Sequence, residues 1–174
     1  MAKKTALIFG ASGQDGTLMS QLLLEKKYNV LAISRSGSKK KIRNKNLLNK
    51  IKLKKINIYN KLKVEDLIKK SKCSEIYYFS GQSSFQDSFI KIIETFRSHN
   101  LPLLNILLSV YKSKKKIKIF NACSGLIYDH KEKKISENSK LNPNSPYGFS
   151  KLVSYLLVKY FRENYNVWCC SGIL

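Results

Sequence analysis

The sequence of 174 residues predicts an α/β fold with a doubly wound parallel sheet. Short apolar runs of strand length alternate along the chain with stretches of helical apolar spacing. A glycine-rich turn connects the first apolar run to the first helical stretch. Strands that alternate with helices are typical of a parallel sheet covered by helices. With 43% hydrophobic residues, the chain is expected to form one domain with a substantial core.

The expected elements alternate from the N-terminus onward. Residues 35–50 are rich in Lys and Asn, and we expect a mobile loop with a short helix there. The chain ends in an apolar tail directly after the last expected strand, so we expect a fragment of a longer protein. Strands are expected near 5–9, 29–33, 54–58, 75–79, 117–121 and 166–170, and helices near 14–27, 63–71, 86–112 and 146–165.

Three glycines, Gly10, Gly13 and Gly16, lie between the first strand and the first helix. A strand, a glycine turn and a helix form the context of a dinucleotide-binding fingerprint. The glycines allow a tight turn, close approach of the main chain to a pyrophosphate, and close packing of helix on strand. The spacing is Gly-x-x-Gly-x-x-Gly, and the alternative is a glycine-rich turn without a ligand. The context favours an NAD(P)-binding Rossmann fold.

The end of the second strand bears on the choice of cofactor. An acid there binds the adenosine ribose of NAD, whereas an arginine accommodates the 2′-phosphate of NADP. The chain has Ser34 and Arg35 at this point and no acid. This favours NADP, with the alternative that Arg35 is one more solvated cation.

Tyr147 and Lys151 are four residues apart, so on a helix they share one face. A free phenol has a pKa of about 10, and a nearby ammonium favours the phenolate. The pair therefore predicts a catalytic base, although an exposed helical pair is the alternative. Ser124 follows the fifth strand at the sheet edge where ligands bind, so we expect Ser124 and Tyr147 to converge on one substrate hydroxyl.

The net charge of +22 raises the possibility of nucleic-acid binding. The lysines form scattered clusters near expected loops, without interleaved aromatic residues, so we expect solvated basic loops and no nucleic-acid partner. Four cysteines without C-x-x-C spacing and two histidines favour no metal site. No targeting segment or membrane span is expected, which fits a reduced cytoplasmic protein.

Several stretches resemble one family of extended short-chain dehydrogenases/reductases, the GDP-mannose 4,6-dehydratases. The resemblance covers essentially the whole chain and implies the N-terminal half of such an enzyme, without its substrate domain. It implies the catalytic residues Ser124, Tyr147 and Lys151, and the cofactor-binding residues Gly10, Gly13, Gln14, Asp15, Gly16, Arg35, Asn60, Tyr147 and Lys151. The resembling stretches include Gly13-Gln-Asp-Gly16, Glu75 to Ser83, Ser88-Phe89, Pro143 to Leu152, Phe161 to Asn166 and Ser171 to Leu174.

The resemblance implies oxidation of a nucleotide sugar at C4, loss of water across C5 and C6, and return of the hydride to C6. GDP-mannose is the substrate it implies, and a homo-oligomer formed through helices near 90–112 and 147–165 is the assembly. Two positions depart from the family pattern. Leu126 stands where the family has the carboxylate that eliminates water, and Asn60 stands where it usually has an Asp near the adenine.

Three functions therefore remain open. The first is a GDP-mannose 4,6-dehydratase homologue impaired by Leu126, and the second is a nucleotide-sugar epimerase or 4-reductase of the same superfamily. The third is a non-catalytic NADP-binding or dimerising subunit.

Overall fold

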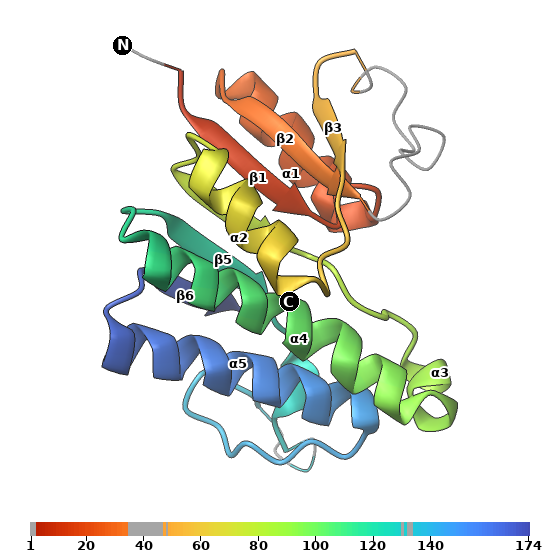
Figure 1. The fold of residues 1–174 in the computed structure, drawn as a ribbon. Helices are drawn as coiled ribbons and strands as arrows, with labels where there is room; N and C mark the ends of the chain where they lie inside the picture. Colours follow the sequence, from red (N-terminus) through yellow and green to blue (C-terminus); the bar gives the residue numbers. More distant parts are fainter. Residues whose placement is uncertain (1–2, 35–46, 48, 130, 132–133) are drawn as a thin grey trace.

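A parallel sheet of six strands forms the centre of the molecule, in the order β3-β2-β1-β4-β5-β6, as the computed structural model shows (Figure 1). The structure describes residues 3–34, 47, 49–129, 131 and 134–174. The predicted doubly wound parallel α/β fold is confirmed. The strands are β1 (Thr5–Phe9), β2 (Asn29–Ser34), β3 (Lys52–Lys55), β4 (Glu75–Tyr78), β5 (Lys118–Ala122) and β6 (Cys169–Gly172). The helices are α1 (Gln14–Glu25), α2 (Lys61–Lys70), α3 (Phe85–Ile90), α4 (Ile92–Ser113), the 3-10 turn η3 (Gly125–Ile127) and α5 (Pro146–Tyr165).

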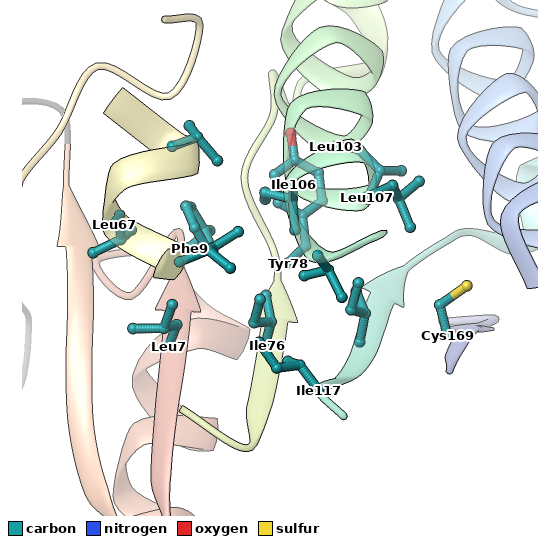
Figure 2. Close-up of a cluster of buried hydrophobic side chains, with 14 of the residues drawn as sticks. Leu7, Phe9, Leu67, Ile76, Tyr78, Leu103, Ile106, Leu107, Ile117 and Cys169 are labelled. Carbon is teal, nitrogen blue, oxygen red and sulfur yellow. The ribbon is translucent and has the colours of Figure 1, made fainter. Parts of the chain in front are cut away.

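Helices cover both faces of the sheet, with α2, α4 and α5 on one face and α1 on the other (Figure 1). Side chains alternate between the faces along a strand. On β1, Leu7 and Phe9 join the larger core beneath α2 and α4 (Figure 2). Ala6 and Ile8 pack in the smaller core with Leu23 of α1. The strand is therefore apolar from Ala6 to Phe9, because both of its faces are buried.

The order of the strands places a switch point beside β1, because the chain moves outward through β2 and β3 and then returns to β4 on the other side. The carboxyl ends of β1 and β4 are in register, with Phe9 opposite Tyr78. Open α/β sheets bind ligands in the crevice at such a point. The fold therefore places the expected site at the carboxyl ends of β1, β4 and β5.

Helix α4 contains Pro102, which has no N–H to donate to the carbonyl of Ser98 one turn earlier. The buried hydroxyl of Tyr78 on β4 donates to that carbonyl at 2.9 Å, and lies 3.2 Å from the carbonyl of His99. The proline thus frees an acceptor that fastens α4 to the central sheet.

Three expected elements differ from the structure. The helix expected at 86–112 is two helices, because Lys91 leaves helical geometry (φ −110°, ψ 49°) and Ser84 caps a separate α3. The strand expected at 54–58 is β3, which ends at Lys55, and the one expected at 166–170 begins only at Cys169 because Asn166 ends α5 in the left-handed conformation. Of the loop expected at 35–50, residues 35–46 and 48 lie outside the described residues. Among the described helices, none is long and apolar enough to cross a bilayer.

Candidate functional site

The glycine turn after β1 has the shape that the fingerprint predicts. Gly10 has a positive φ of 87°, and a Cβ there would lie 2.8 Å from the Phe79 carbonyl carbon and 2.9 Å from the Ser80 nitrogen. A Cβ on Gly16 would overlap the carbonyl oxygen of Gly10. Both contacts are with main chain, which cannot rotate away. The turn therefore requires glycine at both positions, and the main chain lines the crevice.

The N-terminus of α1 begins directly at this turn. Gly13 is its N-cap and provides no side-chain hydrogen bond to the first-turn amides. Thr17 Oγ1 donates instead to the carbonyl of Gly13 at 2.7 Å and lies 3.1 Å from that of Ala11, which fixes the turn to the helix. First-turn amides without a cap are a binding site for a phosphate group. The geometry fits the pyrophosphate of a dinucleotide.

A cleft of about 880 Å³ extends from this turn along the carboxyl ends of the strands. Its volume falls in the range of roughly 300–1,000 Å³ usual for cofactor sites. The cleft is bounded by the glycine turn, the end of β2, the segment after β3, the loop after β4 and α4. It is lined by Gly10, Ser12, Gly13, Gln14, Asp15, Gly16, Ile33, Ser34, Ile58, Tyr59, Phe79, Ser80, Gly81, Gln82, Ser83, Glu94 and Ser98.

Ser124 and Tyr147 meet as the sequence predicts. Ser124 follows β5 and caps η3, accepting from the Leu126 amide at 3.3 Å. Tyr147 lies in the first turn of α5, which Ser145 caps by accepting from the Gly148 amide at 3.0 Å. The Ser124 hydroxyl is near enough to the Tyr147 phenol to lower its pKa by hydrogen bonding. The two hydroxyls can therefore hold one substrate oxygen.

Lys151 lies one turn further along α5 and is only 8% exposed. Its Nζ donates to the carbonyl of Ala122 at 2.9 Å and lies 5.6 Å from the centroid of the Tyr147 ring. Burial lowers the pKa of Lys151 from 10.5 to about 8, although Cys123 and Asp15 raise it. The amine is thus a buried cation that contacts the ring face of Tyr147.

The expectation that Lys151 lowers the pKa of Tyr147 differs from the structure. Burial raises the pKa of Tyr147, Cys123 and Asp15 raise it further, and only the Ser124 hydrogen bond lowers it. The Lys151 amine is directed at a main-chain carbonyl, so its charge does not offset the loss of solvation around the phenol.

The glycine turn and the Tyr147 pair share one electrostatic environment. Asp15, in the first turn of α1, raises the pKa of both Tyr147 and Lys151. Asp15 also lines the cleft. The fold therefore brings the fingerprint and the pair, more than 130 residues apart in sequence, to the same end of the sheet.

Leu126 stands where the family resemblance implies a carboxylate, and Asp129 is the described acid nearest to it in sequence. Leu126 is half-buried in η3, and its amide is bound by Ser124. Asp129 accepts from the Lys131 amide at 3.0 Å and from Asn142 Nδ2 at 3.1 Å. These bonds hold its carboxylate to the loop that follows, and they lower its pKa.

The resemblance also implies cofactor binding by Arg35 and Asn60. Arg35 lies outside the described residues. Asn60 is the N-cap of α2, and its Oδ1 accepts from the Lys63 amide at 3.0 Å. The neighbouring Ile58 and Tyr59 line the cleft, so the Asn60 side chain stabilises the helix beside the site.

Sequence reasoning missed His99, which it considered only as a metal ligand. The ring of His99 lies edge-on to the ring of Tyr147, with centroids 5.5 Å apart. Burial and the charge of Lys151 lower the pKa of His99 to about 3. No motif marks His99, because its place in the site depends on the packing of α4 against α5.

Comparison with known proteins shows which family the chain matches and which solved structures share its fold. The profile of the family described as GDP-mannose 4,6 dehydratase matches residues 7–174. GDP-mannose 4,6 dehydratase from Cricetulus griseus is 32% identical over 184 residues, which cover 99% of this chain and 50% of that protein. GDP-mannose 4,6 dehydratase 1 from Arabidopsis thaliana is 29% identical over 198 residues, covering 99% of this chain and 51% of that protein. The chain thus spans about half the length of these curated relatives.

Solved structures share the fold at lower identity. UDP-glucose 4-epimerase from Brucella ovis, in complex with NAD, superposes with a TM-score of 0.87 at 15% identity, covering 98% of this chain and 51% of the epimerase. Pal from Bacillus thuringiensis superposes with a TM-score of 0.86 at 22% identity, covering 96% of this chain and 54% of Pal.

Proposed function

This chain belongs to the GDP-mannose 4,6-dehydratase family, and from that premise we propose that it binds a nicotinamide dinucleotide and oxidises a hydroxyl of a nucleotide sugar. One observation carries the proposal. Asp15, which lines the cleft beside the glycine turn, acts on the pKa of both Tyr147 and Lys151, so the turn and the Ser124, Tyr147 and Lys151 set lie close to one another.

The residues of the cleft fit a dinucleotide. Gly10 and Gly16 leave a cradle that a Cβ would fill, and the first-turn amides of α1 suit a pyrophosphate. The bound group supplies a hydride acceptor and donor. NADP is the form we propose, because Arg35 and no acid follows Ser34 at the end of β2. Titration with NADPH and NADH tests this proposal. Arg35→Ala is expected to lower the affinity for NADPH and to leave the affinity for NADH unchanged.

Residues of the chain itself transfer the proton of the sugar hydroxyl that is oxidised. Ser124 and Tyr147 hold the reacting oxygen, and Tyr147 takes the proton from the sugar hydroxyl during oxidation. Because burial raises the pKa of Tyr147, its phenol keeps its proton at neutral pH. The site therefore favours proton donation near pH 7, and oxidation is expected to accelerate as the pH rises toward the phenol pKa.

Elimination of water needs a further acid–base group. By resemblance, the complete family reaction converts GDP-mannose to a 4-keto-6-deoxy sugar and uses a carboxylate at position 126. Leu126 cannot carry a proton, and Asp129 is bound to its own loop. Leu126 therefore favours a second candidate function, hydride exchange at a sugar carbon without loss of water, as in an epimerase or 4-reductase.

Incubation of the purified chain with GDP-mannose and NADP separates the candidates. A 4-keto-6-deoxy product supports the dehydratase, whereas hydride exchange without water loss supports the second function. Tyr147→Phe is the control and should abolish either reaction while the chain still binds NADPH. Leu126→Glu is expected to add elimination if only the acid is missing. If NADP does not protect the chain against heat, both enzymatic functions are contradicted.

The partner we propose is a second copy of the chain. Exposed apolar side chains follow one side of the α4–α5 pair, and Phe96 stacks on Phe149 with centroids 6.3 Å apart. The two helices lie side by side (Figure 1). Sedimentation of the wild type and of Leu156→Glu tests this, and only the wild type should dimerise. The exposed set is Ile93, Phe96, Tyr111, Phe149, Leu156 and Tyr160.

A further inference from the structure

Two adjacent residues of α4 bind both polar main-chain groups of one residue in the cleft wall. The amide of Gln82 donates to Ser98 Oγ at 2.9 Å. The carbonyl of Gln82 lies 2.7 Å from His99 Nε2. A carbonyl can only accept, so Nε2 carries the proton and His99 is the donor. Gln82 is therefore fixed from both sides.

The fit of His99 depends on Gly81. A Cβ on Gly81 would overlap the His99 ring, and Gly81 has a positive φ of 150°. His99 is 3% exposed, and its ring packs edge-on against that of Tyr147, with 5.5 Å between the centroids. His99 thus contacts the loop after β4 and the catalytic tyrosine at the same time.

The helix that carries this pair is itself fastened to the sheet. Tyr78 donates to the carbonyl of Ser98, which receives no hydrogen bond from Pro102 four residues later. Burial and the nearby Lys151 keep the pKa of His99 near 3, so the ring is neutral at physiological pH and adds no second positive charge beside Lys151.

We propose that Ser98 and His99 are positioning residues that hold the Gly81–Gln82 wall of the cleft against Tyr147 and thereby place the nicotinamide end of the dinucleotide. This inference rests on the proposed function. Gly81, Gln82 and Ser98 line the cleft. Gly81 and Gln82 follow β4, on the side of β1 where β5 leads to Ser124, so they face the reacting half of the dinucleotide.

Helix α4 also carries a matched control, Asn105, which contacts the opposite wall of the cleft. Asn105 is buried, and its Nδ2 lies 3.1 Å from the carbonyl of Ile58 and 3.3 Å from that of Tyr59. These residues follow β3, beside the end of β2, which is the adenosine side of the cleft. Asn105 and His99 are about 9 Å apart along the helix axis.

The test compares His99→Leu, His99→Gln and Asn105→Leu in the full chain, titrated with NADPH and with ADP. His99→Leu is expected to raise the Kd for NADPH about tenfold and to leave ADP within about twofold. The increase in nicotinamide fluorescence on binding should also fall. His99→Gln keeps an N–H near the place of Nε2 and should restore most of the affinity. Asn105→Leu should weaken NADPH and ADP equally.

Other outcomes overturn the inference. Equal weakening of both ligands by His99→Leu would make His99 only a structural residue, and wild-type affinity for NADPH would remove its role altogether. If His99→Leu does not fold, Ser98→Ala replaces it, with a selective loss of about threefold for NADPH expected. Failure of the wild type to bind NADPH, with ADP still bound, would instead contradict the proposed nicotinamide chemistry and the inference that rests on it.

Discussion

The glycine turn and the Tyr147–Lys151 pair lie close enough for Asp15 to act on both residues of the pair, but they are built in different ways. The turn consists of main chain, and its shape depends on the absence of a Cβ at Gly10 and Gly16. The pair consists of side chains whose ionisation depends on burial, since burial raises the pKa of Tyr147 and lowers that of Lys151. Substitutions of the turn glycines should therefore destabilise the fold through steric overlap. Substitutions of Tyr147 or Lys151 should instead change the charge of the site and leave the fold intact.

Gly10→Ala should have the largest effect. The left-handed conformation costs a Cβ about 1–2 kcal/mol, and overlap with the main chain of Phe79 and Ser80 about 1–3 kcal/mol more. We expect the free energy of unfolding to fall by about 2–5 kcal/mol, with loss of dinucleotide binding. Urea denaturation and NADPH titration measure the two effects.

Gly13→Ala is the control for this substitution. Gly13 has an extended conformation (φ −78°, ψ 175°), and a Cβ would lie 3.3 Å from the Gly10 oxygen. We expect a loss of about 1 kcal/mol or less. Equal destabilisation by the two variants would contradict the steric account of the turn.

Lys151→Met should have an intermediate effect that depends on pH. The pKa of Lys151 is about 8 in the folded chain and 10.5 as its ordinary value, so below pH 8 the buried charge costs roughly 3 kcal/mol. The variant also loses the hydrogen bond to the Ala122 carbonyl, which reduces its gain in stability by about 1 kcal/mol. At pH 7 the variant should be more stable than the wild type by about 2 kcal/mol.

The sign of this difference follows from proton binding. Between pH 8 and 10.5 the unfolded chain binds the proton at Lys151 and the folded chain has released it, so the wild type gains stability as the pH rises. The advantage of Lys151→Met should vanish by about pH 10.5. Urea denaturation of both proteins at several pH values measures it, and a constant difference would contradict the assignment to charge.

Asn60→Ala should have the smallest effect, because Asn60 belongs to neither region and caps α2 after β3. Loss of the N-cap of α2 is expected to cost about 1 kcal/mol, because the Lys63 amide loses its acceptor. Asn60→Asp keeps that acceptor and should retain stability. Affinity for ADP should change little in either variant. A large loss of ADP affinity in Asn60→Ala at nearly unchanged stability would instead show that Asn60 contacts the adenine.

The elements that sequence predicted best are those with strong local signals. Helix α5 begins and ends as expected, because Ser145 and Pro146 start it and Asn166 stops it in the left-handed conformation. The break at Lys91 had no Pro or Gly to mark it, so the apolar pattern across α3 and α4 was taken as one helix. The end of β3 was missed because Ile56 and Ile58 are buried in the core without being in a strand.

The sequence alone determined the order of the elements, the glycine turn and the spacing of Tyr147 and Lys151, because turns, caps and helical periodicity depend on residues a few positions apart. It also determined that Leu126 is not an acid. Only the tertiary structure decided that Asp15 acts on Tyr147, that Lys151 binds Ala122, and that Ser98 and His99 hold Gln82. These contacts join segments far apart in the chain, and their pKa shifts arise from burial, which exists only once the helices have packed on the sheet.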